Sequence, residues 1–344
     1  MELSFLDSGY EQQYDEFLLK SSKTLFFASN KYRQVLKQHL NCKDYYLLAL
    51  DNSEIVGVLP CFIKENNQYG NVINSLPYYG SNGAIIEHNN DYTVKDLLLD
   101  EFKNLCNKYN CVASTLITSP FETDLSYYQN ASHDYVDSRR GLVSHLPKYE
   151  TDLEQTLMAM FNSAQRNAIR KARKFNVNVY IDNSESSIDF LYRTHLDNMM
   201  QVGGKPKERI FFEMIYKQLQ PDVDYDIYIA EQEGVKVSAL LVFYFNKTVE
   251  YFTPVIVNEY RTYQPLCLII LEAMKNATIK RFEYFNWGGT GATQTGVYNF
   301  KKAFGSTEYY YYYYTNLYDK SLLSLSNEII LSEYENFYVF PFQN

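Results

Sequence analysis

The sequence lacks the features that mark several common classes of protein. Its cysteines are few, odd in number and without a C-x-x-C pair, so we expect reduced structural thiols and neither a disulfide framework nor a metal site. The first residues have neither the basic segment nor the apolar core of a signal peptide. The most apolar helix-like run, Pro265 to Met274, is about half as long as a membrane span. These absences predict a cytoplasmic protein, for which a membrane-bound substrate would be met at the membrane surface. The cysteines are Cys42, Cys61, Cys106, Cys111 and Cys267.

Positive charge and histidine are scarce as well. The chain carries 32 Lys and Arg against 41 Asp and Glu, which gives a net charge of -9. A uniformly acidic protein does not bind a polyanion non-specifically, so any phosphate site has to be local. No Cys-His or Ser-His arrangement of a nucleophilic triad stands out, because the histidines are scattered along the chain. They are His39, His88, His133, His145 and His195.

Tryptophan occurs once, whereas 34 tyrosines and 22 phenylalanines make aromatic residues unusually common. Tyrosine combines an apolar ring with a polar tip, so many of these residues suit half-wet clefts or sheet faces. With 344 residues, 46% of them apolar, the chain is too long for one ordinary core. We therefore expect two domains, the first ending near residue 150.

A pattern of strands occurs twice. Residues 45–75 and 227–257 each contain an apolar strand, a tight polar turn, a longer strand, a second polar turn and a third strand. An amphipathic helix and then a returning strand follow in each copy. In the first copy the helix spans 93–110 and the strand 112–118, and in the second the helix spans 261–280 and the strand 282–287. We interpret the two copies as a repeated α/β unit. Chance similarity between two α/β halves is the alternative.

Six consecutive tyrosines, Tyr309 to Tyr314, lie within the strand expected at 308–318. A run of one large residue has no polar face, so both sides of this strand must be aromatic. We predict a central strand covered on both faces, because tyrosine favours strands.

The glycine-rich segment G-G-T-G-A-T-Q-T-G, Gly288 to Gly296, does not fit a nucleotide-binding loop. Val297 stands where a phosphate-binding loop needs lysine, and Gln294 stands where a dinucleotide motif needs glycine. The pattern instead predicts a loop from Gly288, then a short helix over 294–304 closed by Gly305. Ligands of α/β sheets lie beside loops that leave the carboxyl ends of strands. Lys301 on this helix is therefore a candidate site residue, and a solvated surface lysine is the alternative.

Two segments concentrate basic residues. Five of the nine residues at 166–174 are Lys or Arg, and on a helix Arg166 and Arg170 share one face. Arginine suits bidentate contact with phosphate, so this face is a candidate grip on a diphosphate; a solvated helix face is the alternative. The second segment, V-G-G-K-P-K-E-R-I-F-F at 202–212, reads as a mobile loop that brings Lys207 and Arg209 over a substrate, or as an ordinary surface connection.

Several motifs together resemble a known family. They are F-F-A-S-N-K-Y-R-Q-V-L-K (26–37), V-G-V-L-P (56–60), S-L-P-Y-Y-G (75–80), R-N-A-I-R-K-A-R-K (166–174), G-G-K-P (203–206) and G-V-Y-N-F-K-K-A-F-G (296–305). Their order and spacing resemble the FemAB/FemX-type peptidoglycan-bridge transferases and related bacterial GNAT-like N-acyltransferases. The resemblance covers almost the whole chain.

This resemblance implies an α/β fold of the α+β type, with two tandem GNAT-like domains that have mixed, mainly antiparallel sheets flanked by helices. The domains would span 1–150, completed by the tail 317–344, and 151–316. The implied reaction is transfer of an acyl or aminoacyl group to an amine of a nucleotide- or lipid-linked cell-envelope precursor, in peptidoglycan or polysaccharide biosynthesis. The resemblance places Lys301 and Phe300 at the acyl-transfer site. The residues expected to bind substrate are Arg166, Arg170, Lys207, Arg209, Lys37, Tyr251, Tyr298, Asn286 and Trp287.

Two departures from the family leave the acyl donor open between aminoacyl-tRNA and acyl-CoA, with no tightly bound cofactor expected. No helical arm for holding tRNA is visible, and the pyrophosphate loop of acetyl-CoA-dependent enzymes is missing. A third departure is Tyr32, which stands at an early tryptophan position. One alternative is a CoA-dependent N-acyltransferase acting on an amino sugar of surface polysaccharide. Another is a non-catalytic protein that binds nucleotide-sugar diphosphates through 166–174 without Lys301.

Overall fold

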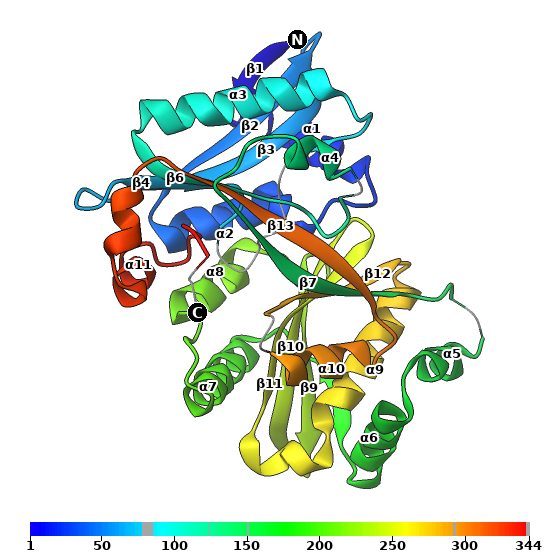
Figure 1. Cartoon of the computed structure of the whole chain (residues 1–344). Coiled ribbons are helices and arrows are strands. Elements are labelled where there is room, and N and C mark those ends of the chain that lie inside the picture. Colours follow the sequence, from blue (N-terminus) through cyan, green and yellow to red (C-terminus); the bar gives the residue numbers. More distant parts are fainter. Residues whose placement is uncertain (78–84, 123, 150, 292–293, 342–344) are drawn as a thin grey trace. The chain divides into compact units, whose positions relative to one another are not determined.

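The strand pattern found twice in the sequence recurs in the structure as two copies with the same order of strand pairing. The computed structural model describes residues 1–77, 85–122, 124–149, 151–291 and 294–341, and the chain divides into two units (Figure 1). Unit 1 comprises residues 1–139 with 310–344, and unit 2 comprises residues 140–309. The sequence analysis places these boundaries at 150/151 and 316/317. Strands β7 (Tyr135–His145) and β13 (Thr307–Leu317) each contain a unit boundary.

Unit 1 is built on a sheet in which β2 pairs antiparallel with β3, β3 antiparallel with β4, and β4 parallel with β6. The parallel step follows from the helix α3 between β4 and β6, since parallel neighbours need a crossover connection. The elements are β1 (Glu2–Phe5), α1 (Glu11–Leu19), η1 (Phe26–Ala28), α2 (Asn30–Leu40), β2 (Lys43–Asp51), β3 (Glu54–Lys64), β4 (Asn71–Asn74), β5 (Ile86–Glu87), α3 (Tyr92–Lys108), β6 (Cys111–Ile117), α4 (Ser126–Gln129), η4 (Lys320–Ser324) and α11 (Asn327–Glu333).

Unit 2 repeats this order, with β9, β10 and β11 antiparallel and β12 parallel to β11 after the crossover helix α9. The predicted repeat is therefore confirmed at the level of strand pairing. The elements are α5 (Leu153–Met160), α6 (Ser163–Lys174), β8 (Asn178–Ile181), α7 (Glu185–Gln201), α8 (Arg209–Gln218), β9 (Tyr225–Gln232), β10 (Val235–Phe245), β11 (Thr248–Ile256), η3 (Asn258–Tyr263), α9 (Pro265–Ile279), β12 (Tyr284–Thr290) and α10 (Thr295–Lys302).

The helix predicted over 261–280 begins later than expected. Residues up to Tyr263 form the 3-10 turn η3, Gln264 adopts a left-handed conformation, and α9 starts at Pro265. Proline is well placed there, because the first helical position needs no backbone N–H donor.

The two faces of the unit 2 sheet are covered by different helices. Tyr251 and Phe285 belong to the apolar core formed with α9. The next residue on β11, Phe252, contacts Phe211 of α8 with ring centroids 5.8 Å apart, so it points to the other face. This alternation decides which side chains of β11 and β12 share a face.

The C-terminal segment packs within unit 1. The hydroxyl of Tyr334 donates to the carbonyl of Gly70 at 2.8 Å, and the backbone N–H of Tyr338 donates to the side chain of Asn74 at 2.7 Å. Strand β13 pairs with β6, and most of its tyrosines are at least half-buried. The expectation that both faces are covered is wrong at Tyr310, whose side chain is 47% exposed.

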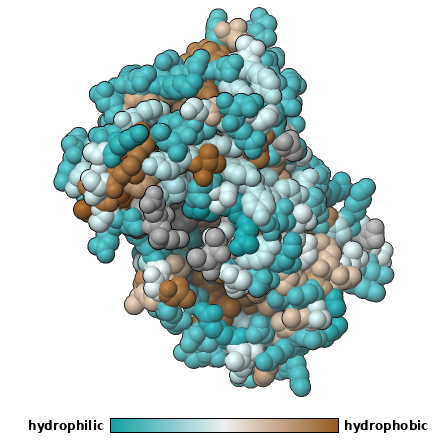
Figure 2. Space-filling model, in the orientation of Figure 1, coloured by the Kyte–Doolittle hydropathy of each residue, from teal (hydrophilic) through white to brown (hydrophobic). Residues whose placement is uncertain are grey.

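Hydrophilic residues cover most of the molecular face in Figure 2, and the apolar ones form small separate groups. None of the helices in the described residues combines the length and apolarity that crossing a bilayer requires.

A glycine allows the chain after helix α10 to pack closely against the end of α5. Gly305 has φ +74°, and a Cβ added there would lie 2.8 Å from the carbonyl oxygen of Met160. Gly305→Ala is therefore expected to lower the free energy of unfolding by roughly 2 kcal/mol, through left-handed strain and the collision. Gly296→Ala is the matched control, since a Cβ there meets nothing within 4 Å. Chemical denaturation of both variants measures the difference, and equal stability would contradict this account.

Candidate functional site

The parallel strands β11 and β12 pair over only three residues. The pairs run from Thr248 with Tyr284 to Glu250 with Asn286, yet β11 continues to Ile256 and β12 to Thr290. Ligands of open α/β sheets bind beyond the carboxyl ends of their strands, where backbone groups are available. We call the point where this pairing stops, at Glu250 and Asn286, the strand fork.

A bulge in β12 follows the strand fork. The register with β7 shifts between Asn286 and Gly289, and Gly288 takes φ +69°. Such bulges re-aim the side chains that follow them. The predicted loop start at Gly288 is wrong, because Gly289 and Thr290 still pair with β7, a long-range contact that local sequence does not reveal. The loop residues 292–293 lie outside the described residues.

Lys301 is buried beside this bulge. Its side chain comes from α10, is 7% exposed, and donates from Nζ to the carbonyl of Gly289 at 3.1 Å and to Oγ1 of Thr290 at 3.4 Å. Burial lowers the pKa of Lys301 to about 8. Within the described part of the chain no carboxylate pairs with this ammonium, so its charge is held by neutral oxygens alone.

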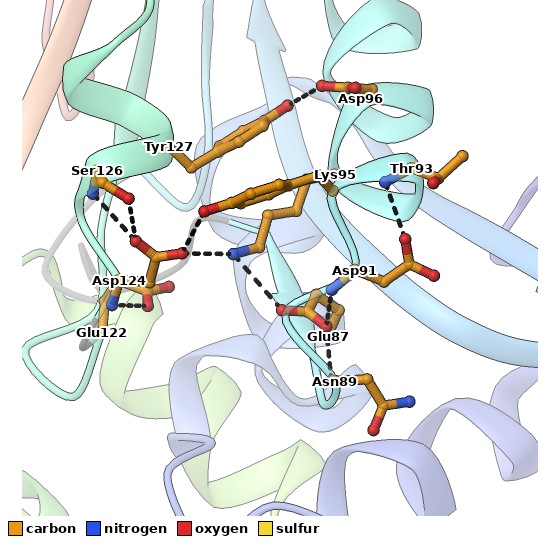
Figure 3. A network of polar contacts seen from close by, with 11 residues as sticks. Glu87, Asn89, Asp91, Thr93, Lys95, Asp96, Glu122, Asp124, Ser126 and Tyr127 are labelled. Carbon is orange, nitrogen blue, oxygen red and sulfur yellow. Dashed lines mark hydrogen bonds and ion pairs between the residues drawn. The ribbon is translucent and has the colours of Figure 1, made fainter.

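The buried Lys95 of unit 1 shows the contrast. Figure 3 places its ammonium between the carboxylates of Glu87 and Asp124, at 3.5 and 3.8 Å. The rings of Tyr92 and Tyr127 lie 5.3 and 5.5 Å from the same nitrogen. The charge of Lys95 is thus compensated by acids and aromatic faces, as expected of a structural ion pair. Of these two lysines, Lys301 is the one held by neutral partners.

Glu250 is a candidate site residue that the sequence analysis missed. Its side chain is 2% exposed, and Oε2 accepts a hydrogen bond from Nδ2 of Asn286 at 2.8 Å. Oδ1 of Asn286 in turn accepts from the backbone N–H of Gly288 at 3.0 Å. Burial raises the pKa of Glu250 to about 8, against the opposing effect of the Asn286 hydrogen bond. The available signal was an acidic residue inside the apolar strand T-V-E-Y-F.

Two predicted substrate-binding aromatics lie in the core instead of a cleft. Tyr251 and Trp287 are buried with ring centroids 5.0 Å apart, and Nε1 of Trp287 donates to Oγ of Ser144 at 2.9 Å. The reason is strand alternation, which turns both residues toward α9 while Glu250 and Asn286 face the other way. These two residues therefore belong to the core under the candidate site and do not line a cleft.

The remaining predicted residues of α10 are half-buried. Tyr298 donates its hydroxyl to the carboxylate of Glu308, and the guanidinium of Arg140 lies 4.4 Å from its ring centroid. Phe300 packs on Phe304 with ring centroids 5.3 Å apart. Phe300 therefore anchors the helix that carries Lys301.

Lys207 is the predicted basic residue tied most directly to the strands of the fork. Its ammonium lies 5.1 Å from the ring of Phe252, two residues beyond Glu250 on the same face, and burial lowers its pKa to about 8. Arg209 is instead exposed and pairs with Asp189 and Glu213, at 3.4 and 3.0 Å.

The other predicted basic residues belong to other elements, α6 and α2. On α6, Arg166 donates to the carbonyl of Phe161, and Arg170 donates to the side chain of Asn167 at 3.0 Å. Lys37 belongs to α2 of unit 1 and lies 3.5 Å from Asp44. Of the predicted site residues, the structure brings Asn286 to the fork and Lys301 to the bulge beyond it.

Comparison with known proteins identifies a family match in this part of the chain. Residues 222–312 match the model of the FemAB family, a segment that includes Glu250, Asn286 and Lys301. The chain is FemAB-like. The chain is similar to a structure of FemX, with TM-score 0.75 and 14% identity, and the match covers 96% of this chain and 99% of FemX. No curated protein matches the sequence significantly.

Two further structures share the fold of this FemAB-like chain. L-PGS from Bacillus licheniformis has TM-score 0.56 and 9% identity, covering 85% of this chain and 89% of its own. A tandem GNAT protein from the clavulanic acid biosynthesis pathway has TM-score 0.54 and 9% identity. The match covers 92% of this chain and 99% of that protein. At these identities the likeness concerns the fold, which is GNAT-like. Together with the FemAB match, it supports an acyltransferase superfamily.

Proposed function

We propose that this FemAB-like chain transfers an acyl or aminoacyl group to an amine of a nucleotide- or lipid-linked cell-envelope sugar precursor. The observation that carries the proposal is the buried ammonium of Lys301, held by neutral oxygens beside the strand fork. An ammonium has three donor hydrogens, so Lys301 can contact a ligand oxygen as well as its two protein acceptors. Its position in the segment that matches the FemAB family model adds support.

The chemistry asks for little beyond this arrangement. The neutral acceptor amine attacks the acyl carbon, a C–N bond forms, and the bond to the leaving group breaks. The proton lost by nitrogen leaves with the departing group or with water. Negative charge that develops on the acyl oxygen is stabilised by a preorganised donor, and that is the role we give Lys301. The backbone groups released at the fork would position the donor.

Burial makes Lys301 suited to this role. With a pKa of about 8, its side chain remains mostly protonated at pH 7 and so keeps its charge. Its surroundings exclude water, which strengthens its electrostatic effect on a developing oxyanion. The ammonium of Lys207 lies against the face of β11 that carries Glu250, so Lys207 is our first candidate for holding a phosphate of the acceptor. Arg166 and Arg170 are the second candidates.

One observation favours acyl-CoA as the donor. The longest helices of the described residues, α3 and α7, have 17 residues each, which leaves no long helical arm of the kind expected to hold tRNA. The alternative is therefore a CoA-dependent N-acyltransferase that acts on an amino sugar. Aminoacyl-tRNA remains the donor that the FemAB likeness favours.

Mass spectrometry tests the function and separates the donors. Purified protein is incubated with desalted bacterial extract, amino-sugar nucleotides and lipid-linked precursors, and either acetyl-CoA or charged tRNA, each with and without RNase. A mass gain on an amine that RNase abolishes would identify aminoacyl-tRNA as donor. A gain that needs the thioester and survives RNase would identify acyl-CoA. No gain in any arm would contradict the proposed function.

A further inference from the structure

The carboxyl group of Glu250 presents two oxygens in different situations. Oε2 accepts from Asn286, whereas Oε1 is buried and has no hydrogen-bond partner among the described residues. A buried polar atom without a partner costs free energy, and natural structures retain few of them. The strand fork lies at this residue, because its pair with Asn286 is the last between β11 and β12.

The neighbouring hydrogen bonds decide where a proton on this carboxyl group lies. The backbone N–H of Gly288 donates to Oδ1 of Asn286, which fixes the amide so that Nδ2 faces Glu250. Oε2 must therefore be an acceptor. A proton carried by Glu250 is then on Oε1, which makes Oε1 a donor.

Nothing charged in the described surroundings stabilises the ionised form. Glu250 has no ion pair among the described residues, and its pKa is raised to about 8 by burial. Titratable groups on the elements packed on this face include Lys207, over the ring of Phe252, and His195, whose Nε2 accepts from the backbone N–H of Lys207. Others on α7 and α8 are Asp189, Arg209 and Glu213, which form ion pairs with one another. On the β12 side the ammonium of Lys301 bonds to Gly289 and Thr290. A carboxylic acid kept neutral in this way can donate a strong hydrogen bond at neutral pH.

We propose that Glu250 acts as a neutral carboxylic acid, whose Oε1–H donates a hydrogen bond to a carbonyl oxygen of the ligand held at the strand fork. This inference rests on the proposed function, in which that ligand is the acyl donor. The hydrogen bond would strengthen as negative charge develops on the carbonyl oxygen. Glu250 thereby selects an acyl or amide carbonyl over a ligand group that can only donate.

Two substitutions separate this role from that of a proton-accepting carboxylate. Glu250→Gln keeps the shape, an acceptor for Asn286 and an N–H donor in place of Oε1–H. Its transfer activity at pH 7 is expected to stay close to that of the wild type. Glu250→Ala removes the donor, and its kcat/KM is expected to fall about 100-fold. Thr248→Val is the matched control, because the Thr248 hydroxyl is buried on the same face of β11, has no hydrogen-bond partner among the described residues and should be dispensable.

The pH dependence supplies a second readout, since a purely structural role would not change it. Above about pH 8 the wild type loses the Oε1 proton, whereas glutamine has none to lose. The ratio of Glu250→Gln to wild-type activity should rise about tenfold per pH unit there. Taking the ratio cancels the titration of Lys301.

Each outcome of the mass-spectrometric assay decides the question. Activity retained by Glu250→Gln and lost by Glu250→Ala supports the neutral acid. Loss in both variants, with normal far-UV circular dichroism, would show that a carboxylate is needed and would overturn the inference while leaving the acyl transfer intact. Retention in both would remove Glu250 from the site. A wild type inactive with either donor would overturn the proposed function and this inference together.

Discussion

Replacing Lys301 with alanine is expected to lower kcat about 100- to 1,000-fold without unfolding the protein, because it removes a preorganised donor to the developing oxyanion. The fold should tolerate the change. Among the described residues the buried ammonium bonds to two neutral oxygens, and the desolvation cost that lowers its pKa disappears with it. Initial rates of amide formation, together with thermal unfolding, measure both effects.

The adjacent lysine provides the control. Lys302 follows Lys301 on α10 but is exposed. Lys302→Ala removes the same charge from the same helix as Lys301→Ala does. Because the Lys302 side chain is exposed, the kcat of this variant should stay near the wild-type value. Wild-type activity in both alanine variants would remove Lys301 from the chemistry. An equal loss of activity in both would point to the net charge of α10.

Substituting Glu250 with glutamine should change how stability depends on pH. The pKa of Glu250 is raised in the folded protein to about 8 from an ordinary value of 4.5. Between these two values the folded state holds a proton that the unfolded chain has released. The stability contributed by that proton is fully present below pH 4.5 and is lost as the pH rises through about 8. The free energy of unfolding of the wild type therefore falls with pH in this window.

The expected slope is about 1.4 kcal/mol per pH unit, the value for one proton. Glutamine cannot titrate, so the difference in stability between Glu250→Gln and the wild type should grow by this amount per unit from about pH 5 to pH 8. Urea denaturation at half-unit pH steps measures it, and other titrating groups cancel in the difference. Parallel stability curves for the two proteins would show that Glu250 is ionised in the native state.

The fold could be predicted largely from the sequence because its signals are local. Apolar strands separated by tight turns, followed by an amphipathic helix, predict both copies of the unit, and the structure confirms their pairing. The closing glycine of α10 is equally predictable, since Gly305 has the positive φ expected of that position.

The site was only partly predictable, because burial depends on contacts distant in sequence. Lys301 and Lys302 are indistinguishable by type, and the contact of α10 with β12 is what buries the first and leaves the second exposed. The bulge at Gly288 depends on the pairing of β12 with β7, more than 140 residues earlier in sequence. Glu250 becomes noticeable only when Asn286 is placed beside it.

The same reasoning explains the errors among the aromatic residues. Tyr251 and Trp287 are among the residues that the sequence analysis expects to bind substrate. Strand alternation instead directs both to the α9 core. A sequence shows that alternate residues face opposite ways, but not which of the two faces meets a ligand.

The most direct measurement is a crystal structure with an unreactive acyl-donor analogue, either a CoA thioether carrying a ketone or an amide-linked aminoacyl-adenosine. Our account predicts that the analogue lies between the carboxyl ends of β11 and β12, with its carbonyl oxygen about 2.7–3.1 Å from Nζ of Lys301, from Oε1 of Glu250 or from both. An analogue bound elsewhere, with both side chains unmoved and without contact to it, would contradict the assignment of the acyl-transfer site to this fork.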